Sequence, residues 1–292
     1  MQRPTAPIMA SPEASLLIAL IHNNSESRCP YIRGRIGELC GALRGNFAIQ
    51  TLEVFFQPEP VPQTSWMSFA RDLMKWRLER RWKQYRELPT RSWATDIKKL
   101  IRHCACMYLS GSGAQDLARA KQHSTLELAV ADKHIRAWTQ FMESGAEWMI
   151  VFEDDAVFRE DSIRRLLDLL QDSSLRSSQH IYIDLSGGCP CDGIQVDRLE
   201  THRDASFRHF RKPVTNTTCT YLISRPLVGL LLEQVVRRPW LRLHQSDWLL
   251  NALFVRLEKQ GLDCLCMHAS PTIFSHGSVT GEYASTFDQG RY

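Results

Sequence analysis

The sequence predicts an α/β fold, and three neighbouring segments support this prediction. The apolar segment 147–152 has the length and the β-branched and aromatic content of a buried strand. A helical pattern of apolar residues precedes it over 127–142, and Gly145 can end that helix. A second helical pattern follows over 161–170. A helix, a strand and a helix in succession are typical of an open α/β sheet with helices on its faces.

Three adjacent acids, Glu153, Asp154 and Asp155, end the central strand of this unit. Crowded carboxylates at the end of a buried strand repel one another and cost stability unless a cation neutralises them. In open α/β sheets, ligands bind in the loops at the carboxyl ends of the strands. We therefore expect a divalent ion with oxygen ligands here, which can also bridge a diphosphate. The alternative is a solvated acidic turn before the helix that begins near Asp161.

Further elements are predicted on both sides of this unit. A first strand is expected at 16–21, and a strand that enters a glycine turn at 179–184. The segment 224–226 begins a helix with a serine cap and a first-turn proline. Another helix is expected over 245–254, and a short strand over 271–276 that ends in His and Gly.

The spacing of the acids from the preceding helix is itself informative. Glu127 is followed seven positions later by His134, then four positions later by Trp138, before the strand that ends in Glu-Asp-Asp-Ala at 153–156. This arrangement resembles glycosyltransferase family 25, the bacterial lipopolysaccharide-type glycosyltransferases. The chain has Lys133 where the family usually has Ser, and Leu where it usually has Gly before the Glu. The departures leave the substrate less determined than the fold.

Two other stretches are similar to the same family. The strand 16–21, followed by Asn23 and Arg28, looks like its first strand and nucleotide-binding loop. The segment 218–225 looks like its later sugar-site strand, and Asp247 falls where the family often has an acid before a helix. The segment of roughly 60–110 has no counterpart in the resemblance.

The resemblance implies a GT-A-type, Rossmann-like fold that binds a nucleotide sugar. We expect one such domain over 15–292, with a basic helical insertion at about 64–110 and a flexible leader at 1–14. The implied reaction transfers a sugar from a nucleotide-diphosphate sugar, a UDP-sugar in our expectation, to a cell-surface glycan such as lipopolysaccharide. Family resemblance also implies an inverting transfer.

The candidate site residues have different expected roles. Glu153 and Asp155 are expected to hold Mn²⁺ or Mg²⁺ with His276 as a third ligand and His268 in reserve. Asp247 is the candidate general base, because an acid at a helix start near the sugar can take a hydroxyl proton. Either Asp247 or its neighbour Ser could instead cap the helix. Contacts to the nucleotide sugar are expected from Asn23, Arg28, Glu127, His134, Asp154 and Asp184, although Asp184 could equally be a satisfied residue at a strand end.

Charge is concentrated in one segment of the chain. The segment from Arg71 to Arg102 contains eleven Lys or Arg residues and only four Asp or Glu residues. Trp66, Trp76 and Trp82 lie in or beside this segment. A basic helix rich in Trp can lie on an anionic membrane, line a phosphate-rich acceptor site or bind nucleic acid. It can also be an ordinary insertion whose Trp side chains pack on the core. Nucleic acid is the partner that we least expect.

Length and composition exclude several classes of protein. At 292 residues, with 43% apolar and 23% charged residues, the composition is that of a globular protein. The apolar run near the start is too short to cross a bilayer and lacks the features of a secretory signal. Nine cysteines, an odd number, include Cys-x-Cys pairs such as Cys264 and Cys266, which are closer together than zinc ligands usually are. We expect reduced thiols in a cytoplasmic protein that works at the inner face of the membrane.

Two other functions remain open. A metal-dependent nucleotidyltransferase or phosphohydrolase also uses clustered acids. A membrane- or nucleic-acid-binding protein without catalysis would make the acidic loop incidental. The chain lacks a phosphate loop, a dinucleotide-binding Gly-x-Gly-x-x-Gly motif and a Gly-x-Ser-x-Gly elbow, so ATP hydrolysis, hydride transfer and serine esterase chemistry have little support.

Overall fold

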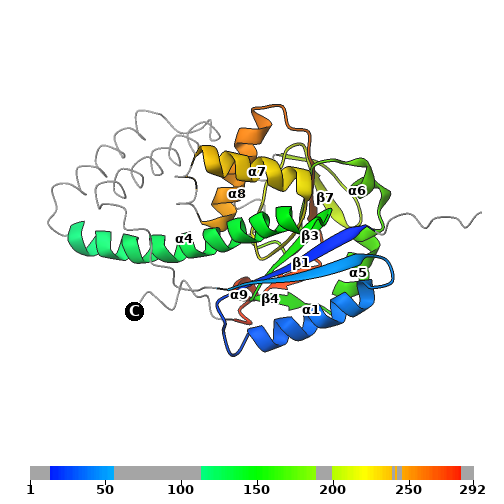
Figure 1. Ribbon diagram of the computed structural model, residues 1–292, viewed down its shortest axis with the longest axis horizontal. Helices are drawn as coiled ribbons and strands as arrows, with labels where there is room; N and C mark the ends of the chain where they lie inside the picture. The colour runs from blue at the N-terminus through cyan, green and yellow to red at the C-terminus, as the bar shows by residue number, and fades with distance from the viewer. Residues whose placement is uncertain (1–13, 56–112, 189–198, 239–240, 242–244, 284–292) are drawn as a thin grey trace, which may run out of the picture.

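A computed structural model describes residues 14–55, 113–188, 199–238, 241 and 245–283 (Figure 1). The side chains of 113–128 are not among the described parts. The basic insertion expected at 64–110, the leader over 1–13 and the side chain of Glu127 therefore lie outside the description. Within these ranges, none of the helices is both long and apolar enough to cross a bilayer.

The main feature is a mixed sheet of eight strands. From one side to the other, its strands are β2 (Ala48–Phe55), β1 (Ser15–His22), β3 (Trp148–Glu153), β8 (Thr220–Ser224), β5 (Ile181–Asp184), β9 (Leu265–Ala269), β7 (Phe207–Phe210) and β6 (Glu200–Arg203). The α/β class predicted from the sequence is confirmed, with both parallel and antiparallel pairings in the sheet.

Strand directions decide where the loops meet. β1 runs parallel to β2 and β3, while β8 runs antiparallel to both of its neighbours, β3 and β5. β5 and β9 are parallel to each other. The ends of β1, β3, β5 and β9 and the start of β8 therefore lie at one edge, called the carboxyl edge below. The starts of β5 and β9 lie at the opposite, amino edge, together with the end of β7.

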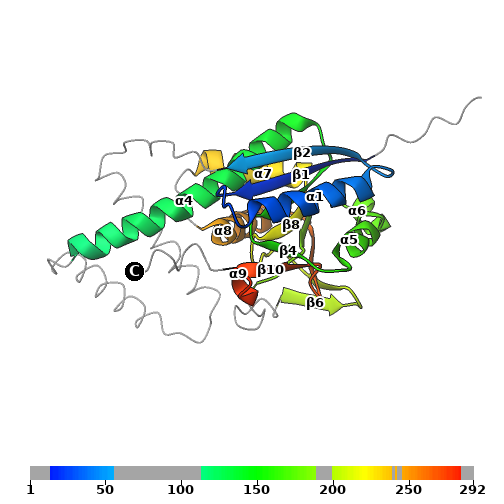
Figure 2. The same ribbon diagram turned by 90° about the horizontal axis from the view of Figure 1, so that it is seen from below.

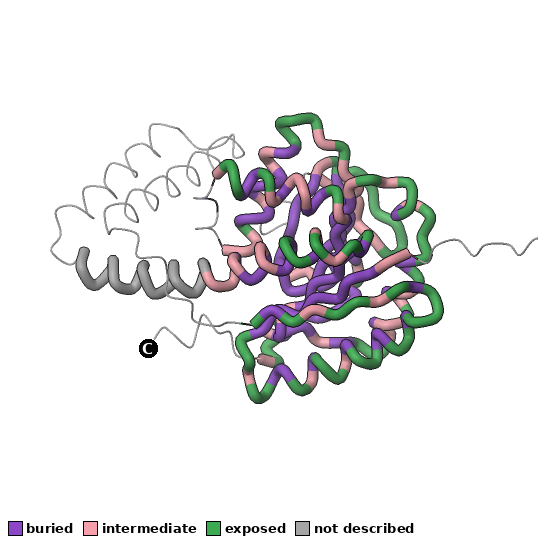
Figure 3. Tube along the Cα trace, viewed as in Figure 1, coloured by how far each residue is buried: buried purple, intermediate pink, exposed green. Residues whose placement is uncertain are grey.

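Helices cover both faces of this sheet. α1 (Cys29–Leu43) and α5 (Ser162–Leu170) lie on one face, and α4 (Gly113–Ser144), α7 (Arg225–Arg237) and α8 (Ser246–Glu258) on the other (Figure 1). The short helices are α6 (Ser173–Ser177) and α9 (Gly277–Thr280). The buried residues concentrate in the strands between these layers (Figure 3).

The alternation of side chains along β1 builds two cores from one strand. Leu16, Ile18 and Leu20 pack into the cluster that includes α1 and α5, while Leu17 and Ile21 pack toward α4 and α7. Burying one aliphatic side chain of this size stabilises a fold by roughly 1.5–3 kcal/mol. A strand apolar on both faces is stable only between two layers, so the continuous apolar run in the sequence already required this position.

A second, small sheet lies beside the acidic loop. β4 (Ala156–Phe158) pairs antiparallel with β10 (Phe274–His276), next to α9 (Figure 2). The rings of Phe152, Phe158 and Phe274 pack against one another at centroid distances of 4.8–5.5 Å. This pairing places His276 opposite Ala156, directly after the three acids. The sequence predicted the short strand that β10 forms, but it predicted a loop leading into a helix after the acids, so β4 and its pairing with β10 were not predicted.

Two local predictions need correction. Ser224 is the residue before α7, as expected, but its hydroxyl makes no cap hydrogen bond. It instead donates to the carbonyl of Gln179 and accepts from the amide of Ile181, which ties the start of β5 to the end of β8. The helix that contains Asp247 is preceded by Gln245, so neither Ser246 nor Asp247 is its N-cap.

Candidate active site

The three acids have separate partners at the carboxyl edge. Asp154 is 6% exposed and joins the loop after β1 to the loop after β3. Its carboxylate accepts from the backbone amide of Asn23 at 3.0 Å and from the guanidinium of Arg28 at 3.3 Å. Arg28 also lies over the ring of Tyr283, at 5.1 Å from its centroid. Three residues expected to contact the nucleotide sugar, Asn23, Arg28 and Asp154, are thus brought together.

Asp155 forms a buried pair with His276. The His276 Nε2 lies 3.1 Å from Asp155 Oδ2, and Ser278 donates its hydroxyl proton to the same oxygen. Burial alone would raise the pKa of Asp155, but the hydrogen bonds and charge of His276, Ser278 and Arg28 together lower it. Burial would lower the pKa of His276, and the Asp155 carboxylate raises it. Both shifts favour a carboxylate paired with an imidazolium.

Glu153 faces a different set of groups. Its Oε1 accepts from His134 Nε2 at 2.9 Å and from the Thr218 hydroxyl at 2.7 Å. The Thr218 hydroxyl also meets that of Ser246, the first residue of α8, at 2.7 Å. His134 is 1% exposed, and its Nδ1 lies 2.9 Å from the hydroxyl of Tyr221. Both ring nitrogens of His134 therefore hold protein partners, which leaves neither for the nucleotide sugar contact expected from the sequence.

A buried lysine lies beside these acids. Lys133, which is 4% exposed, donates to the carbonyl of His22 at 2.9 Å and to the side-chain oxygen of Asn23. Burial lowers its pKa to about 8, although the charges of Asp154 and Glu153 raise it. The sequence singled out this position only as a departure from the family pattern, and its role in the site was missed.

The electrostatic argument made from the sequence therefore needs correction. Three crowded acids were expected to need a bound cation to offset their repulsion. The protein already places Arg28, Lys133 and His276 among them. The acids alone therefore do not require a metal, and any case for one must rest on the geometry of the possible ligands.

One group of possible metal ligands lies within this cluster. A carboxylate oxygen of Asp155, the thiol of Cys219 and a ring nitrogen of His276 lie within 4.8 Å of one another. Among the described residues, Asp155 Oδ1 and His276 Nδ1 are buried without a hydrogen-bond partner. Burial raises the pKa of the Cys219 thiol, so the thiol stays protonated. A protonated thiol is a weak metal ligand. Asp155 and His276, two of the three predicted ligands, are thus together, while Glu153 lies outside this group.

Two other predicted residues have structural partners instead. Asp184, 1% exposed, accepts from the backbone amides of four residues after β5 and before β8. This matches the alternative of a satisfied residue at a strand end, and it leaves no carboxylate oxygen for a sugar. His268 Nε2 donates to the carbonyl oxygen of Val214 at 2.9 Å, and His268 is not part of the group of possible ligands around Asp155.

The predicted base lies at the same edge of the sheet. Asp247 is in the first turn of α8, where its carboxylate accepts from the amide of Trp248 at 2.7 Å. The neighbouring Ser246 contacts Thr218 and through it Glu153. The start of α8 is therefore linked to the acidic loop through Thr218. Trp248, in the first turn of α8, is partly exposed.

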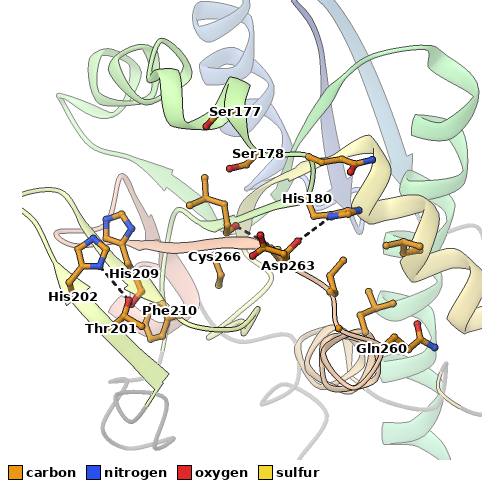
Figure 4. Close-up of a pocket in the computed structure, with 17 residues that line it drawn as sticks. Ser177, Ser178, His180, Thr201, His202, His209, Phe210, Gln260, Asp263 and Cys266 are labelled. Carbon is orange, nitrogen blue, oxygen red and sulfur yellow. Dashed lines mark hydrogen bonds between the residues drawn. The ribbon is translucent and has the colours of Figure 1, made fainter.

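A cavity of about 750 Å³ lies elsewhere, at the amino edge. Imidazoles and hydroxyls line it, with leucines from α7 and α8 behind them (Figure 4). His202 stacks on His209 at 3.9 Å between ring centroids, and His180 contacts the carbonyl of Asp263 at 3.1 Å. These histidines contact one another or residues of neighbouring strands and loops. None of the residues predicted for catalysis or donor binding lines this cavity.

Comparison with protein families supports the resemblance seen in the sequence. Residues 112–247 match the model described as glycosyltransferase family 25 (LPS biosynthesis protein). Over these residues the chain is similar to that family, and the match supports a glycosyltransferase. The match contains the three acids, the helix before them and Asp247, so the recognition from the sequence is confirmed. No curated protein matches the chain.

Solved structures add little to this assignment. The chain is similar to one described as the crystal structure of a glycosyltransferase involved in the glycosylation of the major capsid of PBCV-1. The two are 10% identical, and the likeness covers 77% of this chain and 69% of that one, with a TM-score of 0.29. At this TM-score the likeness supports no argument about this glycosyltransferase.

Proposed function

We propose that this glycosyltransferase takes a sugar from a nucleotide-diphosphate sugar, a UDP-sugar in the first instance, and transfers it to a cell-surface glycan such as lipopolysaccharide. The observation that supports this most is the joining of three loops at one edge of the sheet through Asp154, Glu153 and their partners. The proposed fold type is GT-A. The proposed place of action is the inner face of the membrane.

We further propose that a divalent ion takes part. The residues fit one, because Asp155 Oδ1 and His276 Nδ1 lie in one group and are buried without a partner among the described residues. A carboxylate and an imidazole that gives up its second proton on binding suit Mn²⁺ better than Mg²⁺, which prefers oxygen alone. When bound, the ion would act as a Lewis acid toward the departing diphosphate.

The loop between β1 and α1 is the proposed diphosphate site. The first turn of a helix presents backbone amides that favour anions. α1 begins directly after Arg28, whose guanidinium is suited to phosphate oxygens. Asn23 is exposed beside it, with its side-chain oxygen held by Lys133. These residues would hold the donor so that its sugar lies over the starts of β8 and α8.

The proposed transfer inverts the anomeric centre. Asp247 at the start of α8 takes the proton of the acceptor hydroxyl, whose oxygen attacks the anomeric carbon as the bond to the diphosphate breaks. Attack from the side opposite the leaving group gives the inverted product. The partly exposed Trp248 next to Asp247 offers an aromatic face for the acceptor sugar.

Hydrolysis of nucleotide sugars tests this proposal. The purified chain should release UDP from a UDP-sugar when Mn²⁺ is present, and chelation of the ion should stop the release. A panel of UDP-, GDP-, CDP- and ADP-sugars identifies the donor class. Binding of all nucleotide sugars without release of any nucleoside diphosphate, with or without added glycan, would contradict the proposal.

A further inference from the structure

A row of hydrogen-bonded side chains crosses the interior from α4 to α8 and passes through Glu153. Five contacts between 2.7 and 3.0 Å connect it. His134, Tyr221 and Thr218 in this row are at most 4% exposed. In order, the Glu153 row consists of Trp138, Tyr221, His134, Glu153, Thr218 and Ser246.

The direction of every proton on the α4 side follows from the chemistry of the groups. The indole of Trp138 can only donate, so the Tyr221 oxygen accepts from it at 3.0 Å. A phenol with its usual pKa of roughly 10 is protonated at neutral pH, so the buried Tyr221 hydroxyl carries a proton. That proton meets His134 Nδ1 at 2.9 Å. Nδ1 is then the acceptor, and the proton on Nε2 is donated to Glu153 Oε1.

The α8 side has the opposite direction. The Thr218 hydroxyl donates its single proton to Glu153 Oε1. Its oxygen can then only accept, so the Ser246 hydroxyl must donate to it. Protons from both ends of the row therefore converge on the same carboxylate oxygen.

Because both donors bind Oε1, the two carboxylate oxygens of Glu153 have different environments. Hydrogen bonds to a carboxylate are stronger than those between neutral groups, and two of them hold Oε1 in place. The side chain is nevertheless 21% exposed, unlike the other members of the row that contact it. The exposed part of Glu153 lies at the carboxyl edge, where the donor is proposed to bind.

We propose that His134 and Tyr221 are positioning residues that fix the Nε2–H tautomer of His134 and thereby direct the second oxygen of Glu153 into the active site. Thr218, just before β8, and Ser246, at the start of α8, hold the first oxygen of Glu153 from the other side. This inference rests on the proposed glycosyl transfer at the same site. It replaces the expectation that His134 contacts the nucleotide sugar, because the ring is buried with both nitrogens engaged.

Substitution at His134 separates positioning from simple packing. The amide N–H of Gln can donate in place of Nε2, whereas Leu fills the space and cannot donate. We expect His134→Leu to lower kcat for UDP-sugar hydrolysis by roughly 10- to 100-fold, the usual cost of losing a supporting hydrogen bond in a site. His134→Gln should recover most of that loss, and KM should change little in both. Equal losses in the two variants would overturn the proposal.

A spectroscopic measurement tests the row without any activity. In ¹⁵N-labelled protein, His134 should show a protonated Nε2 and a bare Nδ1, assigned from the resonances that His134→Gln removes. Tyr221→Phe deletes the donor to Nδ1 and should mix the two tautomers. A protonated Nδ1 in the wild type would overturn the proposal. If the wild type released no nucleotide from any sugar donor, the proposed function would fail. The measured tautomer of His134 would still show whether the hydrogen bonds of the Glu153 row run in the proposed directions.

Discussion

The carboxyl edge and the amino edge of the main sheet are both rich in polar side chains, but they hold them differently. At the carboxyl edge, Asp154, Asp155 and Lys133 are each less than 10% exposed and are paired with one another or with neighbours. At the amino edge, Lys212 pairs with Glu258 at 3.1 Å in an exposed position, and the cavity there is open.

This difference indicates which edge is built for chemistry. Burying a charge costs several kcal/mol before its partners offset the loss, so buried charges persist where a function needs them. An exposed pair costs little and stabilises little. The cavity at the amino edge offers open space, but the carboxyl edge has the groups whose loss should matter. Substitutions at the two edges can separate these cases.

The largest effect is expected from Asp155→Asn. Asn keeps the size of the side chain but removes the negative charge that faces His276. It also replaces one of the two carboxylate oxygens that could bind the ion with an amide nitrogen. Metal-dependent binding of UDP should be abolished, as measured by titration calorimetry with and without Mn²⁺. The matched control is Asp204→Asn, which breaks an exposed carboxylate–histidine pair in the turn between β6 and β7 and should bind as the wild type does. Metal-dependent binding that survives Asp155→Asn would move the ion site elsewhere.

A smaller but still large effect is expected from Asp247→Asn. The side-chain oxygen can still accept from the amide of Trp248, so α8 should begin as before. Transfer to an acceptor should fall by roughly 10²- to 10⁴-fold, as for other lost general bases, while the affinity for the donor stays the same. Rates within a few-fold of the wild type would show that another group takes the proton.

Lys133 gives a prediction about pH and stability. Its pKa is lowered by burial to about 8 in the folded protein, against roughly 10.4 in an unfolded chain. Between these values the unfolded state binds more protons, so stability rises with pH and the penalty is fully present below pH 8. Relative to Lys133→Met, the wild type should gain on the order of 2 kcal/mol between pH 8 and 10. Parallel unfolding curves across this range would show that the folded pKa is unshifted.

The smallest effect is expected at the amino edge. His202→Ala and His209→Ala remove the stacked pair beside the cavity but leave every contact of Glu153, Asp154 and Asp155 in place. Hydrolysis of the donor and transfer to the acceptor should both stay within about two-fold of the wild type, because surface changes usually cost under 0.5 kcal/mol. A selective loss of transfer would instead assign the cavity to the acceptor.

The sequence was sufficient for the parts of the molecule that have a repeating apolar pattern. The strand before the acids, the helices on either side of it and the first strand appear as predicted, because one buried face must recur at a fixed period. Cys264 and Cys266 are packed with one core cluster, as their spacing along a strand suggested. The family resemblance was recognised from Glu127, His134 and Trp138 and their spacing before the acidic motif at 153–156.

The site could be predicted only in part, for physical reasons. The acids were found because three charges after an apolar strand are conspicuous. The hydroxyl groups around them were not, because a hydroxyl such as that of Thr218 or Ser246 has no pattern in a sequence. The contact between Asp155 and His276 depends on the pairing of β4 with β10, which joins segments far apart in the chain. The burial of His134 and Asp184 likewise follows from packing and not from composition.

The most direct test of the central claim is a hydrogen-exchange footprint of UDP with Mn²⁺. Two sets of backbone segments should respond differently, because the donor is proposed to bind only at the carboxyl edge. Protection is expected at 22–29, 153–156, 216–218 and 275–278, with no change at 177–180, 201–209 and 260–265. Protection confined to the segments around the amino-edge cavity would contradict the account.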